Sequence, residues 1–276
     1  VREYELKRVR AQLLTPEELQ RNRASCSCVV LSSPVDGRIL RVLREAEELS
    51  DLVKAAGKPL AGQLRMSVIP TIAPFMLPRI LPRLRSERPD LKLMLREETS
   101  HDAVESLQHG RADCVLLALP FDTGEVDSAH IADDRLYVAM PEGEPRNPPD
   151  TIPPSMIEEG RLLLLEDGHC LRDHALDACK LRDADVTMPY QATSLNTIVQ
   201  MVANGIGITL LPRMALDAHI LSGTDVHTAH FNERGVARKI GLMWRRKTPR
   251  HEQFRVLGEF IQRSYSVGQD TARACG

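Results

Sequence analysis

The sequence predicts an α/β protein with a parallel sheet, and three observations point to it. Segments with strand periodicity and segments with helical periodicity alternate from about residue 64 to residue 265, which is the order expected of βαβ units. The strand expected over 114–119 is apolar throughout, as fully buried strands are. The chain has 276 residues, 42% of them hydrophobic, enough for one large domain or two of modest size.

Residues 1–37 are polar and mixed in charge, and they carry only weak apolar periodicity. An amphipathic helix is expected over 38–57, because apolar side chains recur near helical spacing and Gly57 ends the pattern. Its apolar face comprises Ile39, Leu40, Leu43, Ala46, Leu49 and Val53. Residues 59–62 resemble a hinge that leads into the α/β region.

The first half of that region is expected to contain strands over 64–69, 91–95 and 114–119 and helices over 76–87 and 101–109. The first two strands are indicated by apolar side chains at alternate positions. The first helix contains an awkward second proline, Pro82, in its interior. The second helix ends before Gly110, a residue typical of helix ends.

The second half is expected to contain strands over 136–140, 162–165, 186–191, 208–211 and 239–244, and helices beginning near residue 169 and covering 194–204 and 250–265. The helix over 194–204 has clear boundaries, because Thr193 or Ser194 can cap its start and Gly205 follows its last turn. Its apolar face comprises Leu195, Ile198, Val199 and Val202.

The composition excludes several classes of protein. Lys and Arg number 36 against 38 Asp and Glu, a net charge of −2, so bulk electrostatic capture of nucleic acid is not indicated. Aromatic residues make up 4%, too few for a platform on which single strands stack. We find no apolar run near the roughly 20 residues of a membrane span and no signal-peptide pattern. A cytoplasmic protein without a membrane partner is therefore expected.

Cysteine is the unusual part of the composition. The six cysteines are Cys26, Cys28, Cys114, Cys170, Cys179 and Cys275. In a chain of this length without an export signal they are not expected to form a secreted disulfide framework, which leaves free thiols, metal ligands or redox groups. Cys26 and Cys28 are too close together for the usual zinc-ligand spacing, Cys114 is expected in the core, and Cys275 is expected to be exposed and incidental.

Cys170 lies in the most informative local pattern. It follows an expected strand and Gly168, at or near the start of a helix, where unsatisfied N–H groups and the helix dipole favour a thiolate. The adjacent His169 and Arg172 can add positive charge or hydrogen bonds. A thiolate in such a place can attack a peroxide and become a sulfenic acid.

Cys179 follows Cys170 by nine residues. Within one helix the two residues would lie about 13 Å apart on opposite faces, whereas a disulfide needs Cα atoms within about 7 Å. A disulfide would therefore require the segment to unfold or rewind, and oxidation would be coupled to a structural change. Two alternatives remain open: two small buried residues on one helix, or a metal site of Cys170, His174 and Cys179, of which only the first two share a face.

The segment 165–179, with its Gly-His-Cys-Leu-Arg-Asp run, closely resembles the redox-active segment of peroxide-sensing LysR-type transcriptional regulators. Three further stretches are similar to the same family, in the same order along the chain. They are residues 67–78, the Leu-x-x-Gly-x-x-Asp pattern of 107–113, and the pair 192–197 and 201–212. Residues 238–244 fit the family's return strand, so the resemblance covers about 38–265.

The resemblance implies two α/β subdomains like those of a periplasmic binding protein, joined by two crossovers. Subdomain one would comprise 62–132 plus 239–276, and subdomain two would comprise 133–238. Together they would form an effector domain over 58–276, preceded by a linker helix over 38–57. The family's effector pocket lies in the cleft between the two subdomains.

The resemblance also implies a redox site that needs neither a cofactor nor a metal. Cys170 would be the peroxidatic thiol and Cys179 the resolving thiol. The peroxide pocket would be formed by Thr71, Ser100, His169, Arg172 and Asp173. The family usually has Thr where this chain has Ser100. Taken without the resemblance, Thr71 would be a hydroxyl at a strand end or turn and Ser100 a helix N-cap before His101.

The N-terminus departs from the family, whose members begin with a winged helix-turn-helix before the linker helix. Residues 1–37 show no helix-turn-helix pattern and no recognition helix. We therefore expect a truncated or frame-disrupted form that keeps the sensor and has lost the DNA reader, and DNA-binding residues are unknown.

The implied function is the redox-sensing regulatory region of a regulator of oxidative-stress genes. The implied partners are hydrogen peroxide, further copies of the chain in a homodimer or homotetramer, and promoter DNA and RNA polymerase for the full-length family. Sensing of this kind is stoichiometric, so no enzyme is expected. The competing interpretation is a LysR-type domain that senses a small organic ligand, with incidental cysteines. A thiol peroxidase comes third, because no recycling motif such as Cys-x-x-Cys is present.

Overall fold

The computed structural model describes residues 60–143, 150–157, 161–182, 190, 192–231 and 236–274. Contacts divide the chain into Val1–Leu43 and Arg44–Gly276, and every described residue lies in the second unit. The expected segments 1–37 and 38–57 lie outside the described residues, as do Cys26, Cys28 and Cys275. The strand expected over 186–191 also lies outside them, apart from the single residue Tyr190.

The described strands are β1 (Gly62–Val68), β2 (Leu91–Glu97), β3 (Cys114–Leu119), β4 (Val126–Pro141), β5 (Thr151–Ile152), β6 (Thr209–Pro212), β7 (Val226–Phe231) and β8 (Ala237–Arg245). They are ordered β2-β1-β3-β8-β4-β7-β5, and β6 also pairs with β4. β1 is parallel to β2 and β3, and β5 is parallel to β7. The pairings of β8 and β4 are antiparallel. The prediction of a parallel sheet was therefore wrong in part, because the sheet is mixed.

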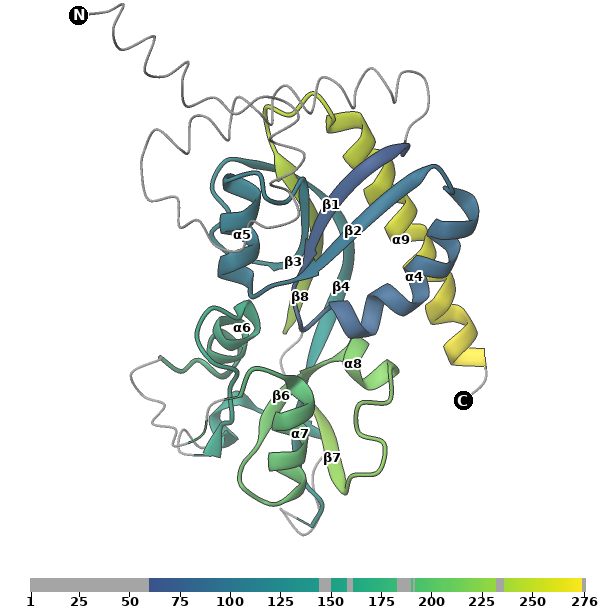
Figure 1. Cartoon of the computed structure of the whole chain (residues 1–276). Helices are drawn as coiled ribbons and strands as arrows, with labels where there is room; N and C mark the ends of the chain where they lie inside the picture. Colours follow the sequence, from purple (N-terminus) through teal and green to yellow (C-terminus); the bar gives the residue numbers. More distant parts are fainter. Residues whose placement is uncertain are drawn as a thin grey trace, which may run out of the picture. The chain divides into compact units, whose positions relative to one another are not determined.

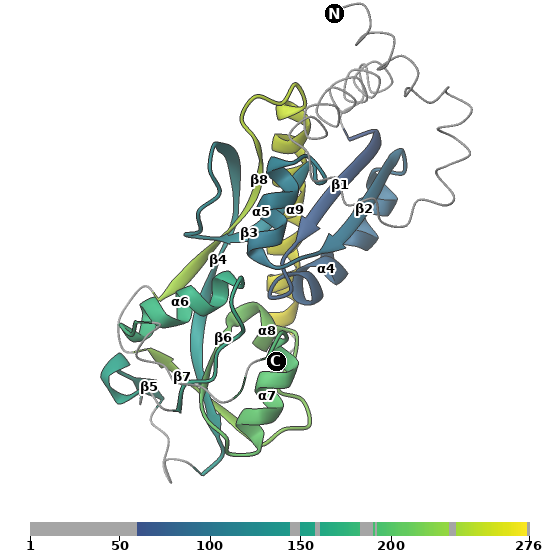
Figure 2. The ribbon, with the colours of Figure 1, turned by 60° about the vertical axis from the view of Figure 1, so that its left-hand side comes forward.

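The long strand β4 links two groups of strands (Figures 1 and 2). Its first part, Val126–Arg135, pairs with β8. Its last part, Leu136–Pro141, pairs with β6 and β7 instead. Only 136–140 was expected as a strand; the first part was missed because its polar side chains, such as Asp127 and Asp133, hide the strand periodicity.

The described helices are α4 (Ala73–Glu87), α5 (Ser100–Gln108), α6 (Cys170–Cys179), α7 (Leu195–Ala203), α8 (Arg213–Asp217) and α9 (His251–Ala274), with a short 3₁₀ turn, η1 (Pro154–Met156). The helices expected over 101–109, near 169 and over 194–204 are confirmed as α5, α6 and α7 to within a few residues. Pro78 and Pro82 lie inside α4, on its exposed face. α8 and β7 were not expected from the sequence.

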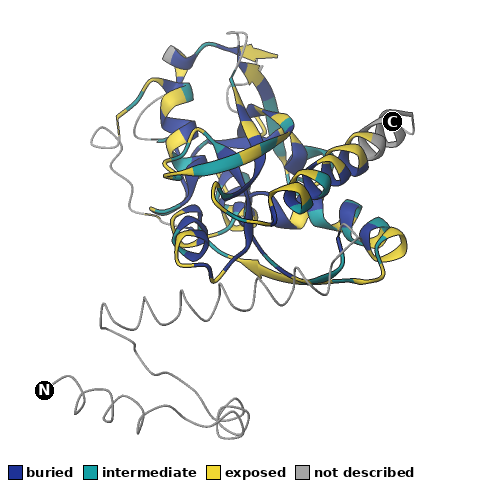
Figure 3. Cartoon of the chain, turned by 90° about the horizontal axis from the view of Figure 1, so that it is seen from above, coloured by how far each residue is buried: buried dark blue, intermediate teal, exposed yellow. Residues whose placement is uncertain are grey.

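α9 packs against α4, β4 and β8, whereas α5 packs against β1 and β3 (Figure 1). α9 has one buried face that includes Phe254, Leu257 and Phe260, and Figure 3 shows it as a dark stripe on the helix. Gly258 allows the helix to lie close to the sheet, because an added Cβ would stand 2.7 Å from Cβ of Ala129. None of the described helices combines the length and the apolar character needed to cross a bilayer.

Residues 162–165 were expected to form a strand, and they do not. All four leucines are buried, but the segment makes only two isolated parallel bridges, from Leu162 to Ile208 and from Leu165 to Ala192. Burial of the four leucines therefore explains the apolar run, although the segment forms no regular ladder of strand hydrogen bonds. The segment still fixes the loop that follows it, which leads to Cys170.

Candidate functional site

Cys170 is the first residue of α6, as the sequence predicted. The chain reaches it through Gly168, whose φ of +89° is a conformation that favours glycine, and through His169 at the N-cap position. The backbone carbonyl of Gly168 also accepts a 3.2 Å hydrogen bond from the His101 N–H of α5. These contacts place the thiol at the start of α6, next to the first turn of α5.

The two cysteines occupy opposite ends of one ten-residue helix. Nine residues at about 1.5 Å each separate them by about 13 Å, so their sulfur atoms cannot bond while α6 is intact. Both are free thiols in this structure, and both are buried. The helix expected to begin near residue 169 thus extends over both cysteines. Burial raises the pKa of the Cys179 thiol to about 12.

The environment of Cys170 differs from the one the sequence suggested. The sequence indicated a stabilised thiolate, but burial raises the pKa of the Cys170 thiol and is the largest influence on it. Arg238 and hydrogen bonds from the Ser100 hydroxyl and the Ala118 backbone act in the opposite direction, whereas Asp173 adds to the rise. The resting group is therefore a buried thiol with thiolate-stabilising groups beside it.

Ser100 lies directly against Cys170 and is not an N-cap. Thr99 caps α5 instead, because its side chain accepts a 3.2 Å hydrogen bond from the Asp102 N–H. Ser100 is 1% exposed, and its Oγ accepts a 3.0 Å hydrogen bond from the Cys170 backbone N–H. The alternative N-cap role for Ser100 was therefore wrong, and the structure brings this hydroxyl to the candidate thiol.

Thr71 lies in the turn between β1 and α4 and is buried. Its Oγ1 accepts a 2.8 Å hydrogen bond from Nη1 of Arg238, and its carbonyl oxygen accepts another from Nη2 at 2.8 Å. Arg238 is itself fully buried and forms a 3.0 Å ion pair with Asp134. Thr71 is thus hydrogen-bonded to the Arg238 guanidinium, which lowers the pKa of the Cys170 thiol.

Arg238 is the principal residue that sequence reasoning missed. From the sequence it is expected only as part of the return strand over 238–244, although its position carries a recognisable pattern. Along β8 the buried face includes Ile240 and Leu242, and the two-residue period of a strand puts Arg238 on that same face. A charged residue on a buried strand face needs a partner, and Asp134 of β4 lies directly opposite it in the ladder.

The remaining predicted residues have different surroundings. His169 is buried, its Nε2 has no hydrogen-bond partner among the described residues, and burial lowers its pKa against the influence of Glu166 and Asp102. Arg172 forms a 3.1 Å ion pair with Asp167 and donates to the Leu165 carbonyl at 3.2 Å, which braces the loop before α6. Asp173 is exposed in the first turn of α6.

The metal alternative is wrong for Cys170, His174 and Cys179. The two cysteines lie at opposite ends of α6, and the three residues do not form one of the groups of potential ligands that the described part of the chain brings together. Cys114 is confirmed as a core residue of β3, and burial raises the pKa of its thiol.

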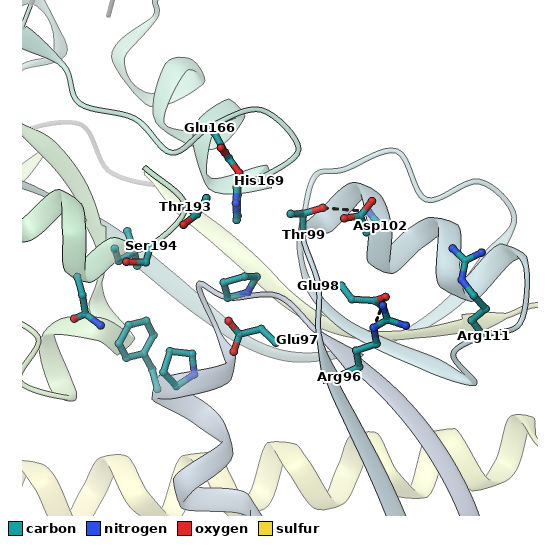
Figure 4. A pocket seen from close by; sticks show the side chains of 15 residues that line it. Arg96, Glu97, Glu98, Thr99, Asp102, Arg111, Glu166, His169, Thr193 and Ser194 are labelled. Carbon is teal, nitrogen blue, oxygen red and sulfur yellow. Dashed lines mark hydrogen bonds and ion pairs between the residues drawn. The ribbon is translucent and has the colours of Figure 1, made fainter. Parts of the chain in front are cut away.

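A cleft of about 880 Å³ lies beside this site. Its walls come from the start of α4, the end of β2 with the start of α5, the loop around His169, and the start of α7. Figure 4 shows His169, Thr193 and Ser194 on one side, with Glu97 and Thr99 across from them. The labelled lining residues are Arg96, Glu97, Glu98, Thr99, Asp102, Arg111, Glu166, His169, Thr193 and Ser194. Of the predicted residues, His169 is the one that lines this cleft.

Comparison with known proteins gives a consistent result. The family described as LysR substrate binding domain matches residues 57–266. The chain is 36% identical to the HTH-type transcriptional regulator EstR of Acinetobacter baylyi over 245 residues, which are 89% of this chain and 81% of EstR. It is 34% identical to the DNA-binding transcriptional dual regulator OxyR of Escherichia coli over 221 residues, 80% of this chain and 72% of OxyR.

A solved structure of a cysteine mutant of Corynebacterium glutamicum OxyR, with hydrogen peroxide bound, is also similar. The TM-score is 0.76 at 29% identity, over 88% of this chain and 78% of that one. The expected fold class, an α/β protein with two subdomains like those of a periplasmic binding protein, is confirmed by these similarities.

Proposed function

Because this chain belongs to the LysR substrate binding domain family, as an OxyR-like member, we propose that it is the redox-sensing regulatory region of a transcription regulator that responds to hydrogen peroxide. The observation that carries the proposal is the placement of Cys170. It is a buried thiol at one end of a helix whose other end is Cys179, with Ser100 and Arg238 acting on its sulfur. The family consists of transcription regulators rather than enzymes, and the proposed reaction is accordingly stoichiometric.

The proposed chemistry has two balanced steps. In the first, the Cys170 sulfur attacks one oxygen of H₂O₂, the O–O bond breaks, and the thiol proton leaves with the second oxygen as water. Cys170 becomes a sulfenic acid and the peroxide is reduced. In the second, the Cys179 thiol attacks the Cys170 sulfur, an S–S bond forms, and the sulfenic hydroxyl leaves with the thiol proton as a second water.

The surrounding residues have distinct proposed roles in the first step. Arg238 stabilises negative charge on the sulfur as the proton leaves, and Ser100 holds the Cys170 backbone and donates to the sulfur. Thr71 fixes the Arg238 guanidinium, whose other partner is Asp134. His169, the residue before Cys170, supplies a buried ring nitrogen without a partner among the described residues, which is proposed to order the peroxide or its waters. Arg172 and Asp173 support the loop and the first helical turn.

The second step requires α6 to open, since the two sulfur atoms cannot meet across an intact helix. We propose that this change alters the arrangement of a homodimer or homotetramer and so controls oxidative-stress genes through promoter DNA and RNA polymerase. The proposed division of the chain is an irregular segment over 1–37, a linker helix over 38–57, subdomain one over 62–132 plus 239–276, and subdomain two over 133–238. The proposed compartment is the cytoplasm.

The central test is thiol mapping after a stoichiometric dose of hydrogen peroxide. We expect mass spectrometry to find a peptide in which Cys170 is linked to Cys179, and we expect Cys170→Ser to abolish it. Cys114→Ser is the matched control and is expected to leave the link intact. An unmodified Cys170 at this dose would contradict the proposal, and sustained peroxide consumption with a thiol reductant would favour a peroxidase instead.

DNA binding by this chain is tested separately. We expect no sequence-specific complex in a mobility-shift assay with promoter DNA, because residues 1–37 carry no helix-turn-helix pattern. Tight, sequence-specific binding would overturn that expectation and leave the redox proposal unaffected.

A second candidate function is the sensing of a small organic ligand, and the cleft favours it. A volume of about 880 Å³ with charged and hydroxyl side chains on its walls falls within the size range of small-molecule sites. The similarity to EstR, whose name does not mention peroxide, is compatible with it. Thermal-shift screening of small polar metabolites tests this function, and a ligand that raises Tm in Cys170→Ser as much as in the unchanged protein would support it.

A further inference from the structure

His174 is a buried ionisable residue of α6 that the proposed chemistry does not use. It follows Cys170 by one helical turn and is 7% exposed. One ring nitrogen, Nε2, lies 2.8 Å from the carbonyl oxygen of Pro120, just after β3. A carbonyl can only accept, so Nε2 carries the proton and donates. The other nitrogen, Nδ1, is buried without a hydrogen-bond partner among the described residues.

The surroundings of His174 favour the neutral ring. Burial lowers the pKa of His174 below its ordinary value of 6.5, and the Arg238 guanidinium of β8 lowers it further. The Pro120 carbonyl and Asp177 on α6 itself act in the opposite direction. The elements with the most contacts to α6 are β3 and η1, and apart from Cys114 neither carries an ionisable side chain. The α5 residue hydrogen-bonded to α6 at Cys170 is Ser100, which is not ionisable near neutral pH.

His174 lies within the segment that changes conformation in the proposed Cys170–Cys179 switch. It lies between Cys170 and Cys179, on the turns that must unwind before the two sulfur atoms can meet. Unwinding would remove the ring from beside Arg238 and from its contact with Pro120, and would expose Nδ1 to water. Once the ring is exposed to water and away from Arg238, we expect the pKa of His174 to return toward its ordinary value.

We propose that His174 is a proton-linked positioning residue: its neutral ring holds α6 against Pro120, and Nδ1 takes up one proton when α6 opens to form the disulfide. The inference rests on the proposed Cys170–Cys179 switch. The closed, reduced form binds fewer protons at His174 than the open, oxidised form. By linkage, a fall in pH shifts the equilibrium between the reduced and oxidised forms toward the oxidised form.

The proton balance makes the effect measurable. When an external disulfide oxidises the protein, two electrons and two protons pass from the Cys170 and Cys179 thiols to that disulfide, which becomes a dithiol. This exchange is independent of pH as long as all four thiols stay protonated. His174 adds the uptake of one proton from solvent below about pH 6.5, so the equilibrium constant for oxidation rises as pH falls.

The experiment measures the fraction of Cys170–Cys179 disulfide in dithiothreitol redox buffers between about pH 5.5 and pH 7.5. The test variant is His174→Gln, whose amide N–H can still donate to Pro120 but cannot titrate. Between these pH values we expect the equilibrium constant for oxidation to rise more in the unchanged protein than in His174→Gln, by at most about tenfold. His169 is present in both proteins, so its contribution cancels. The matched control His130→Gln, an exposed histidine of β4, is expected to behave like the unchanged protein.

The outcomes separate this inference from the function on which it rests. No disulfide in any protein would overturn the proposed function. A disulfide whose pH dependence is the same with and without His174 would overturn this inference alone. If His174→Gln does not fold, an NMR titration of the unchanged protein decides: we expect the His174 ring to stay neutral through pH 6.5 when reduced and to titrate near 6.5 when oxidised, and a reduced-state pKa at or above 6.5 overturns the inference.

Discussion

At the scale of single residues, the sulfur of Cys170 is subject to opposing influences. Burial raises its pKa, while Arg238, the Ser100 hydroxyl and the Ala118 backbone N–H lower it. Burial is the larger influence, so the thiolate is the minor form at neutral pH. The site therefore combines a protected resting thiol with groups that stabilise charge once the proton leaves.

The first prediction concerns the pH dependence of this thiol. Since the thiolate reacts with peroxide and the pKa of Cys170 is raised, the thiolate fraction should grow about tenfold per pH unit through neutral and mildly alkaline pH. We expect the second-order rate of oxidation by H₂O₂, measured by stopped flow, to rise with pH without a plateau between about pH 6.5 and 8.5. A plateau anywhere in this range would mean that the pKa of Cys170 is not raised and would contradict this account.

The second prediction concerns the hydroxyl of Ser100. Ser100→Ala removes the acceptor for the Cys170 N–H and the donor to its sulfur. A hydrogen bond of this kind contributes about 1 kcal/mol, so we expect peroxide oxidation to slow roughly 3- to 10-fold. The matched control is Ser106→Ala, a buried serine on the same helix that bonds to Glu98 instead. Equal slowing in both variants would mean that the effect comes from α5 packing rather than from the thiol.

Local sequence explains which site residues could be predicted. Cys170, His169 and Arg172 are neighbours within one motif. Thr71 and Ser100 were assigned only through the family resemblance, and both follow strands that end at the same edge of the sheet. Arg238 and Asp134 lie far from the motif along the chain, and pairing of β4 with β8 brings them together. That pairing could not be predicted because the first part of β4 has no clear strand periodicity. The sign of the Cys170 pKa shift was missed for a related reason, since burial depends on the whole tertiary structure.

At the scale of elements, α6 is the part whose stability decides the proposed switch. It ends at Lys180, which adopts the left-handed conformation with φ of +57°. A residue with a side chain is strained by about 1 kcal/mol in that conformation, whereas glycine is not. The conformation of Lys180 therefore lowers the stability of the C-terminal end of α6.

The third prediction uses that strained position. Compared with Lys180→Ala, which removes the same side chain but keeps the strain, Lys180→Gly should stabilise α6 by about 1 kcal/mol. We expect the equilibrium constant for disulfide formation, measured in a thiol redox buffer, to be roughly fivefold lower in Lys180→Gly than in Lys180→Ala. If the two variants have the same constant, α6 does not have to open at its C-terminal end.

Elements with a strong local pattern were predicted well. α5 and α7 have capping residues, Thr99 and Ser194, whose side chains accept from the helical N–H groups, and glycines follow both helices. The segment 162–165 was misassigned because an apolar run reports burial and not strand pairing. β7 was missed because His227, Thr228 and His230 leave no clear apolar face in the sequence.

At the scale of the whole molecule, one buried ion pair joins the two groups of strands linked by β4. Arg238 of β8 bonds to Thr71 before α4, and Asp134 of β4 accepts a 3.0 Å hydrogen bond from the Met214 N–H at the start of α8. The Arg238–Asp134 contact thus connects β4, β8, α8 and the turn before α4. These are the elements where β4 changes partners from β8 to β6 and β7.

The fourth prediction concerns this ion pair. Asp134→Asn keeps the size of the side chain but leaves the Arg238 charge buried without a counter-charge, which costs about 3–5 kcal/mol when a buried pair is broken. We expect urea unfolding to show a loss of that order in the free energy of unfolding. The control is Asp133→Asn, an exposed neighbour, which should change the free energy of unfolding by less than about 0.5 kcal/mol. Similar losses in both variants would contradict the assigned role.

The separation of the two cysteines by the full length of α6 has a consequence for timing. On the proposed mechanism, the sulfenic acid at Cys170 must wait until α6 opens, so the frequency of helix opening sets its lifetime. During that interval a second peroxide or a small cellular thiol can react with it first. A brief pulse of oxidant and a sustained one would then leave different products on the same sulfur. The rate at which α6 opens would decide which of these products forms.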